Sequence, residues 1–200
     1  MFVTDGWSSR EQLSIELSEK DKDLLLNIKI IFPEASLTSR TRNTNFSTNC
    51  TCYRLSFCSM PLVKYFYSIG FSQYDKTNTA APPNFNYSKA DFWRGVIDGD
   101  GSLGLRKADQ KYKQPFISLT TKSELLKEAY LIMLKEIVHQ TYHPNRNTRD
   151  NIYNICVGGS RSYNLAHYLY DNPLISMPRK LEKAQLIFNH EQGERVLRDV

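Results

Sequence analysis

Alternating apolar and polar residues predict strands along much of the chain. In residues 12–18, the apolar side chains Leu13, Ile15 and Leu17 alternate with polar neighbours, which is the period of a strand with one face in a core. The segment 53–58 alternates in the same way. Runs of similar character predict further strands at residues 37–42, 103–106, 116–120, 140–143 and 151–157.

Apolar residues spaced three or four apart predict helices between these strands. Ser18 is placed to cap a helix with an apolar stripe that extends to Pro33. Ser123 caps a helix over residues 123–139 in the same manner. Further helices are predicted at residues 61–69, 89–97, 161–170 and 180–189.

The elements follow a similar order in the two halves of the chain. A polar stretch that contains Pro82 and Pro83 separates the halves and suits an extended linker. We therefore expect an N-terminal half at 1–75, a linker at 76–88 and a C-terminal half at 89–200. Each half has the order helix, two strands, helix, two strands, helix, with the opening helix of the first half missing, which predicts an α+β duplication.

The composition of the chain limits the classes of binding partner and the cellular compartment that we expect. The chain has 26 Lys and Arg against 21 Asp and Glu, a net charge of +5 that permits a polyanionic partner such as nucleic acid without requiring one. No segment approaches the roughly 20 apolar residues of a membrane span, and the first residues lack the order of a secretion signal. The four cysteines lack CxxC spacing, so we expect reduced thiols in an intracellular protein without a membrane partner.

The segment 92–105, FWRGVIDGDGSLGL, carries the most chemical information. An apolar helix there runs directly into acidic residues flanked by glycines, and a strand follows. Gly95 has no side chain to hold a partner helix away, and Asp100 lies at the helix end between Gly99 and Gly101. Two such helices crossing at their glycines would bring two carboxylates together, which suits a hard divalent cation beside a phosphate.

This segment resembles the motif of the LAGLIDADG homing endonucleases. The residues that match the motif letter for letter are Gly95, Ile97, Asp98, Asp100 and Gly101. Trp93 and Arg94 stand where the motif has Leu and Ala. The resemblance therefore departs from the family's pattern at the upstream end of the helix.

The first six residues, MFVTDG, resemble the last six positions of the same motif. Asp5 then falls on the position of Asp100, 100 − 5 = 95 residues earlier. About one and a half helical turns that precede this point in the motif are absent before Met1. A start further upstream, a fragmentary chain or a tolerated short helix would each explain this; we favour the first two and expect weak or absent cleavage by the 200-residue chain.

The resemblance implies two pseudo-symmetric αββαββα domains that form a β-sheet saddle on double-stranded DNA. It implies a monomeric endonuclease that hydrolyses phosphodiester bonds with Mg²⁺, for which Mn²⁺ can substitute. The implied catalytic residues are Asp100, Asp5 and Lys180, and the implied metal ligands are Asp100, Asp5, Gly101 and Gly6. The implied DNA contacts are Arg10, Gln12, Ser14, Arg40, Arg42, Arg54, Arg106, Lys107, Ser118, Thr120, Arg146, Arg149 and Asn154.

Several of these residues also have a structural interpretation that involves no catalytic or DNA-binding role. Asp98 is expected to be a hydrogen-bond partner within the fold, and a lysine at a helix start, such as Lys180, is usually solvated. The strand arginines taken singly suit a solvated sheet face. His139 and His143 lack the glutamate of a zinc-binding HExxH helix, so we expect an exposed or hydrogen-bonded pair.

Two other functions remain open at this point. A catalytically weak or inactive nucleic-acid-binding protein of the same fold, either an intron RNA maturase or a DNA-binding regulator, would keep the saddle without cutting. A degenerate fragment of a mobile element, carried by an intron or an intein, would keep neither activity. In each case we expect the cytoplasm of a bacterial or phage-infected cell, or an organelle.

Overall fold

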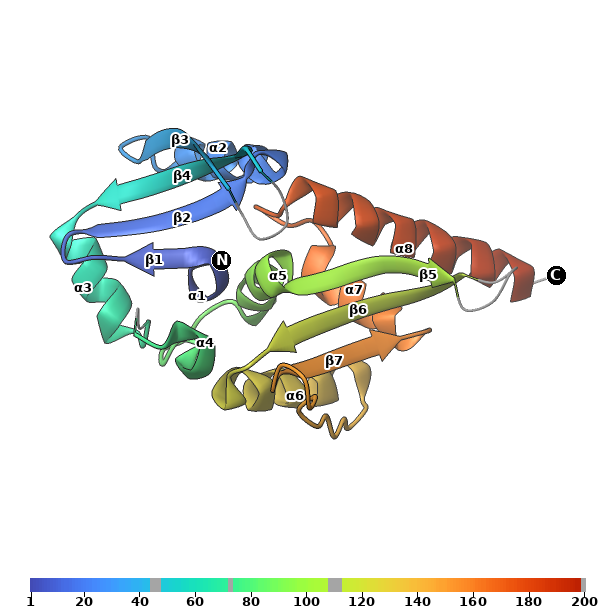
Figure 1. Ribbon diagram of the computed structural model, residues 1–200. Coiled ribbons are helices and arrows are strands. Elements are labelled where there is room, and N and C mark those ends of the chain that lie inside the picture. The colour runs from blue at the N-terminus through green and yellow to red at the C-terminus, as the bar shows by residue number, and fades with distance from the viewer. Residues whose placement is uncertain (44–47, 72–73, 108–112, 199–200) are drawn as a thin grey trace.

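A computed structural model describes residues 1–43, 48–71, 74–107 and 113–198 of the chain (Figure 1). The elements of the first half are α1 (Phe2–Asp5), β1 (Gly6–Ser8), β2 (Gln12–Ser18), the 3₁₀ turn η1 (Glu19–Asp21), α2 (Lys22–Ile31), β3 (Ser36–Arg42), β4 (Cys50–Cys58) and α3 (Met60–Ser68). After α4 (Lys76–Thr79), the second half has α5 (Lys89–Asp100), β5 (Gly101–Lys107), β6 (Lys113–Thr121), α6 (Glu124–Val138), β7 (Tyr153–Gly158), α7 (Arg161–Tyr170) and α8 (Pro178–Arg198).

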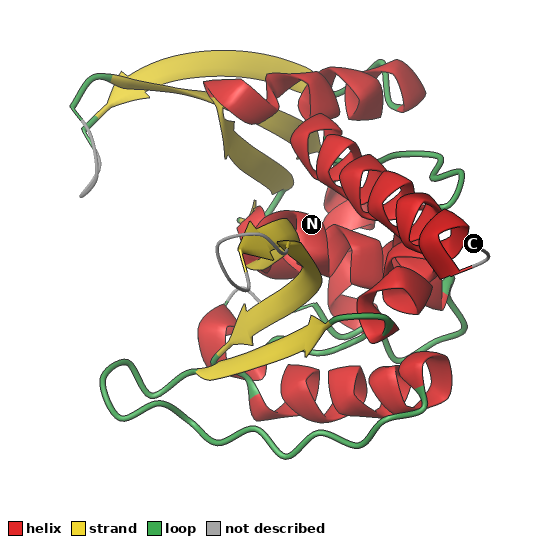
Figure 2. Cartoon of the chain, turned by 90° about the vertical axis from the view of Figure 1, so that its right-hand side faces the viewer, coloured by secondary structure: helices red, strands yellow, loops and turns green. Residues whose placement is uncertain are grey.

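Each half has its own antiparallel sheet and its own core. The first sheet has the order β1-β2-β4-β3, and the register that pairs Ile15 with Leu55 aligns their apolar faces. The second sheet has the order β5-β6-β7. Trp93 and Tyr130 are fully buried in the second core, which α5, α6, α7 and α8 share with that sheet. Viewed from the side, the sheets lie on one side of the molecule and most helices on the other (Figure 2).

The prediction of a strand at residues 140–143 is wrong, whereas the other predicted strands are present. His139 has a left-handed backbone with φ of 53° and ends α6, and the next residues run as a loop. Pro144 within this loop has no N–H to give to a ladder, and only an isolated bridge joins Arg146 to Tyr153. Between α6 and β7, the described residues therefore contain no counterpart of β3 in the first half.

Other departures concern helix ends and the linker. Asp21, not Ser18, is the N-cap of α2, because the turn η1 intervenes. The expected linker contains the short helix α4, and residues 72 and 73 just before it lie outside the described residues. Ser123 caps α6 as predicted, since its hydroxyl accepts a hydrogen bond from the Leu126 amide. No helix in the described ranges combines the length and the apolar character that crossing a bilayer requires.

A segment of the second half crosses to the first and joins the two. Met177 is buried in the first core, and Ile175 packs against the same cluster. Arg179, at the start of α8, donates to both carboxylate oxygens of Asp21 at 2.5 and 3.2 Å. Asp21 is only 5% exposed, so this pair fixes α8 to the base of α2.

Arg179→Ala should therefore lower the free energy of unfolding by about 1–2 kcal/mol, because it leaves a buried carboxylate without its partner. Urea denaturation followed by circular dichroism measures this difference. Arg149→Ala, at a site where the arginine side chain is 87% exposed, is the matched control and should leave the midpoint unchanged. Equal midpoints for both variants would show that the Asp21 pair does not hold the halves together.

Candidate active site

Helices α1 and α5 meet at glycines, and we call this contact the helix seam. A Cβ atom on Gly99 would come within 2.6 Å of both Thr4 Cβ and Asp5 Oδ2, closer than real carbon contacts allow. At Gly95 a Cβ atom would lie 2.9 Å from the backbone nitrogen of Met1. The glycines of the motif are therefore required by close helix approach, as their sequence context predicts.

The seam brings Asp5 and Asp100 together. Asp5 ends α1 and Asp100 ends α5, and the Asp5 carboxylate reaches the backbone of Gly99, the residue before Asp100. Desolvation and the negative charge of Asp5 together raise the pKa of Asp100 to about 6, against the opposing charges of nearby ammonium groups. Although the two carboxylates are 95 positions apart in the sequence, they lie close enough for the charge of Asp5 to raise the pKa of Asp100.

Lys76 is a site residue that the sequence analysis missed. Its ammonium group donates to the carbonyl oxygens of Thr4 and Gly6, the latter at 2.6 Å, and so holds the end of α1. Burial lowers the pKa of Lys76, while the charges of Asp5 and Asp100 oppose that change. The Ser123 hydroxyl fixes the segment after α4 by donating to the Ala80 carbonyl at 2.5 Å. A lysine in a polar linker has no pattern that would have indicated this role.

Lys180 holds the end of α5 in the corresponding way. Its side chain is buried, and its ammonium group donates to the carbonyls of Gly101 and, at 3.2 Å, Ile97. Burial lowers the pKa of Lys180 to about 8, and the charge of Arg179 acts in the same direction. Lys180 is therefore placed behind the site, in contact with backbone, and is not a solvated lysine at a helix start.

These hydrogen bonds change what is expected of Gly6 and Gly101. Each glycine follows one of the two aspartates, and its carbonyl was predicted to be a metal ligand. Each carbonyl instead accepts a hydrogen bond from an ammonium group. A metal ion on the same oxygen would be repelled by that charge, so the carboxylates of Asp5 and Asp100 are the ligands that the geometry favours.

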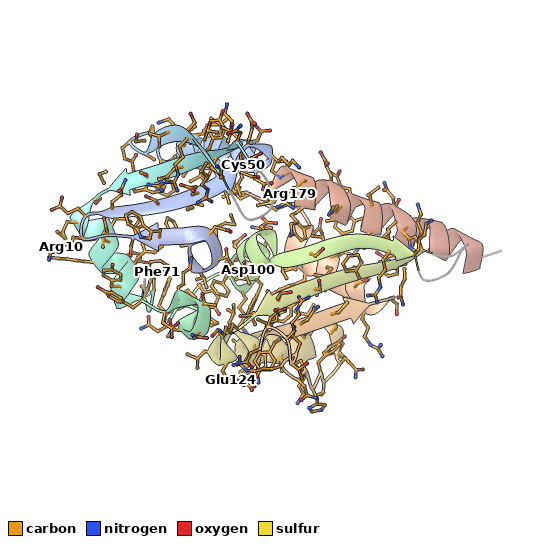
Figure 3. All side chains as sticks on the ribbon, in the orientation of Figure 1. Arg10, Cys50, Phe71, Asp100, Glu124 and Arg179 are labelled. Carbon is orange, nitrogen blue, oxygen red and sulfur yellow. The ribbon has the colours of Figure 1, made fainter. Side chains whose placement is uncertain are left out.

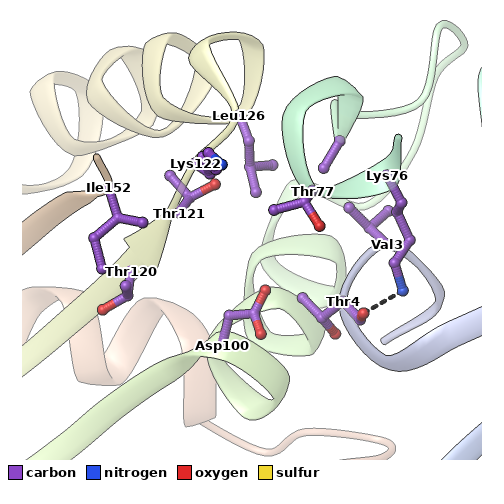
Figure 4. A pocket seen from close by; sticks show the side chains of 11 residues that line it. Val3, Thr4, Lys76, Thr77, Asp100, Thr120, Thr121, Lys122, Leu126 and Ile152 are labelled. Carbon is purple, nitrogen blue, oxygen red and sulfur yellow. Dashed lines mark hydrogen bonds between the residues drawn. The ribbon is translucent and has the colours of Figure 1, made fainter. Parts of the chain in front are cut away.

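A cavity of about 310 Å³ opens beside the seam (Figure 4). Asp100 and Thr4 point into it from α5 and α1, and Lys76 lies opposite Asp100. Val3 of α1 and Ile152, just before β7, also line it, and the other lining residues lie in or next to α4, the end of β6 and the start of α6: Thr77, Ala80, Thr120, Thr121, Lys122 and Leu126. The cavity is thus formed by both halves and the linker, with acidic and basic groups on its walls.

Asp98 supports the seam from within, as the sequence analysis expected. Its carboxylate accepts hydrogen bonds from the Tyr170 hydroxyl at 2.7 Å and from the Met177 amide at 2.8 Å. Arg94 donates to the backbone carbonyls of Leu169 and Ile175, at 2.9 and 2.8 Å. The arginine that departs from the motif therefore ties α5 to the crossing segment at 171–177.

The residues predicted to contact DNA lie on the outward sheet faces, beside the ends of strands β2 and β5, or in the loop before β7. Those on the outward faces of the sheets, opposite the cores, are Gln12, Ser14, Arg40, Arg42, Arg54, Arg106, Ser118, Thr120 and Asn154. Arg40, Arg42 and Arg54 converge on Glu16 in the first sheet. Arg10 is exposed in the turn before β2, and Lys107 is exposed at the end of β5 in register with the core-facing positions.

Three of these residues have partners of their own within the structure. Ser14 is only 2% exposed and its hydroxyl is paired with that of Ser56 at 3.0 Å, so neighbouring side chains cover it. Arg146 donates to the Asn151 carbonyl and lies over the Tyr153 ring, which gives it a structural role in its loop. Arg149 pairs with the adjacent Asp150 at the tip of the same loop. Figure 3 labels two other predicted site residues, Arg10 at the turn before β2 and Asp100 at the end of α5.

The carboxylate pair fits a hard divalent cation. Its two acidic groups have oxygen donors, and Asp100 is disfavoured as an anion until a positive charge compensates it. Among the described residues, no three His, Cys, Asp or Glu side chains cluster around a potential metal position. All four cysteines are free thiols, as predicted. A cation at the seam would therefore depend on two carboxylates, with water or a phosphate supplying the other ligands.

Comparison with known proteins agrees with this geometry. A family model described as a LAGLIDADG-like domain matches residues 88–199, which is more than half of the chain. No curated protein matches it. The fold is similar to that of a solved structure of the homing endonuclease I-WcaI bound to its DNA recognition sequence. The two sequences are 18% identical, the match covers 90% of this chain and 81% of that chain, and the TM-score is 0.60.

Two further solved structures share the fold. The meganuclease I-AabMI bound to uncleaved DNA has 13% identity, covers 92% of this chain and 85% of its own, and gives a TM-score of 0.55. I-SmaMI bound to uncleavable DNA has 11% identity, with 99% and 93% covered and a TM-score of 0.56. From the motif, the α+β fold and the matching family model together, we conclude that this chain belongs to the LAGLIDADG-like family.

Proposed function

We propose that the chain is a site-specific double-strand DNA endonuclease that requires a divalent cation. The observation that carries this proposal is the meeting of Asp5 and Asp100 at the helix seam, beside a cavity that both halves line. Arginines on the outward sheet faces supply positive charge for a duplex. The solved structures of similar fold that hold DNA support the same assignment.

In this proposal, Asp5 and Asp100 would hold Mg²⁺ or Mn²⁺ between them. When bound, the cation would supply stabilisation of negative charge on the phosphate and an acidified water molecule. Lys76 and Lys180 hold the ends of the two helices, so the carboxylates keep their positions as the phosphate approaches. Water is the proposed nucleophile, and the reaction would proceed without a covalent intermediate.

A selection experiment tests this function without a known target. Because weak cleavage is expected of the 200-residue chain, it is incubated in excess and for a long time with a randomised duplex library, with Mg²⁺ or with EDTA, and new DNA ends are sequenced. Cutting at one recurrent sequence in Mg²⁺ alone supports the proposal. Retention of a recurrent sequence without new ends would instead support the alternative, a DNA-binding protein that has lost cleavage, and retention of no sequence would refute both.

Lys76→Met should slow cleavage of the selected site by about 10- to 100-fold. The substitution removes the ammonium group that holds the end of α1 and lies opposite Asp100, while the exposed arginines on the sheets remain. Single-turnover cleavage and equilibrium DNA binding are compared for this variant and for Lys64→Met, an exposed control on α3. An equal cleavage rate in both variants would exclude Lys76 from the active site.

A further inference from the structure

Glu16 lies at the centre of a basic cluster on the first sheet, which we call the arginine cluster: Arg40, Arg42 and Arg54. The Glu16 carboxylate is in the middle strand β2, and the arginines come from β3 and β4. Arg40 and Arg54 each place a guanidinium nitrogen 2.8 Å from a Glu16 oxygen, and Arg42 places one at 3.2 Å. Three cations from two strands therefore share one anion on the outward face.

The charges of this cluster do not cancel. One carboxylate facing three guanidinium groups leaves a net positive charge of two, and the arginine side chains are 50%, 48% and 35% exposed. Glu16 itself is 15% exposed. Burial raises the pKa of Glu16, but hydrogen bonds from Arg40 and Arg54 outweigh burial and hold that pKa below its ordinary value. Glu16 is thus an anion throughout the neutral pH range, although the surface around it is basic.

An anion in this position has two physical effects on DNA binding. It repels phosphates, which weakens the sequence-independent attraction that free arginines would provide. It also restrains long side chains, so that their remaining N–H groups stay at fixed positions above the strands. Fixed, forked donors are what recognition of a guanine edge requires, whereas flexible ones pair with any phosphate.

Among the described residues, the second sheet shows no comparable cluster. Its outward arginine, Arg106, lies over the Phe116 ring and donates to neutral partners, the Gln114 side-chain oxygen and the Cys156 sulfur. In the first sheet, Arg54 also lies over an aromatic ring, that of Trp7, with 5.9 Å between guanidinium and ring centre. The feature that distinguishes the two faces is therefore the central carboxylate and not the aromatic support.

We propose that Glu16 is a specificity-determining residue that orders the arginine cluster for reading one half of the DNA target and suppresses binding to unrelated DNA. This inference rests on the proposed DNA-binding function. It assigns to the first half a recognition role that depends on an acidic residue. It also predicts that removing a negative charge from this basic face will impair discrimination while strengthening non-specific binding.

The test compares the wild-type chain with Glu16→Gln, which keeps the size of the side chain and removes its charge. A duplex that the wild-type chain selects from a random library, and a scrambled duplex of equal length, are bound at several salt concentrations. Glu16→Gln should bind scrambled DNA about 3- to 10-fold more tightly at low salt, with a steeper salt dependence. The ratio of specific to scrambled affinity should fall by about tenfold or more.

Glu34→Gln is the matched control, because it removes the same charge from an exposed site outside the sheet. Substituting base pairs one at a time across the target should show that Glu16→Gln loses discrimination in one half only. If both variants change affinity equally and keep the wild-type ratio, Glu16 has no special role and the inference is wrong. If the wild-type chain selects no sequence, the proposed function fails first, and the inference falls with it.

Discussion

Asp100→Asn should lower the rate of DNA cleavage by at least about a thousandfold while changing DNA affinity little. The amide keeps the size of the carboxylate at the end of α5 but cannot hold a divalent cation with Asp5. The arginines of the sheet faces lie elsewhere and remain available for the duplex. Single-turnover cleavage and gel-shift binding of the selected target measure the two effects separately.

The same substitution should make the metal-free protein more stable. The raised pKa of Asp100 means that the native state binds a proton more tightly than the unfolded chain, whose carboxyl has an ordinary pKa of 3.8. Stability from this group is present below pH 3.8 and is lost as pH rises through about 6. Above that pH, Asn should raise the free energy of unfolding by about 1 kcal/mol, a value that allows for solvent screening of a carboxylate that is only partly desolvated.

Asp23→Asn, at an exposed position on α2, is the control for both measurements. It should leave cleavage and the thermal midpoint in EDTA unchanged. A cleavage rate in Asp100→Asn close to that of this control would mean that the reaction does not use Asp100. A lower thermal midpoint for Asp100→Asn would mean that the carboxylate stabilises the seam rather than straining it.

Gly99→Ala should disrupt the seam and remove most activity without replacing a charged residue. The new methyl group would overlap Thr4 and approach Asp5 Oδ2 to 2.6 Å, so α1 must move away from α5. Overpacking of this kind costs about 1–3 kcal/mol of stability. Displacement of Asp5 by about 1 Å should slow cleavage about a hundredfold. Urea denaturation and single-turnover cleavage give the two numbers.

A second-site change distinguishes a steric cause from a general loss of stability. Thr4→Gly removes the Cβ and Oγ1 atoms that the new methyl group would strike, so the double variant should recover part of the lost cleavage. The native Ala90, half-buried on the first turn of α5, shows that the helix accepts alanine away from the seam. Wild-type cleavage by Gly99→Ala would exclude tight helix contact as the organising feature.

The features that depend on contacts between residues close together in the sequence could be predicted from the sequence. The strand at Gln12–Ser18 and the cap at Ser123 follow from period and from side-chain chemistry within a few residues, and both are present. The motif at 92–105 predicted the glycine contact and the role of Asp98. Helix α5 extends three residues beyond its predicted end at residue 97. Residues 98–100 are helical, and the helix ends only at Gly101.

Features that depend on distant contacts could not be predicted in this way. Lys76 acts on Thr4 and Gly6, about seventy residues earlier, through a helix that a polar linker gave no reason to expect. The role of Arg94 depends on carbonyls in a segment that only the fold brings to α5. The strand expected at 140–143 is absent because a left-handed residue, His139, ends α6 and Pro144 lies in the loop that follows.

The central claim is that Asp5 and Asp100 form one cation site shared by both halves. Titration of Mn²⁺ by calorimetry, with the wild-type chain, Asp5→Asn, Asp100→Asn and the double variant, tests it most directly. A shared site predicts that either single substitution removes the same binding event and that the double variant loses nothing more. Independent, additive losses from the two single variants would contradict the claim.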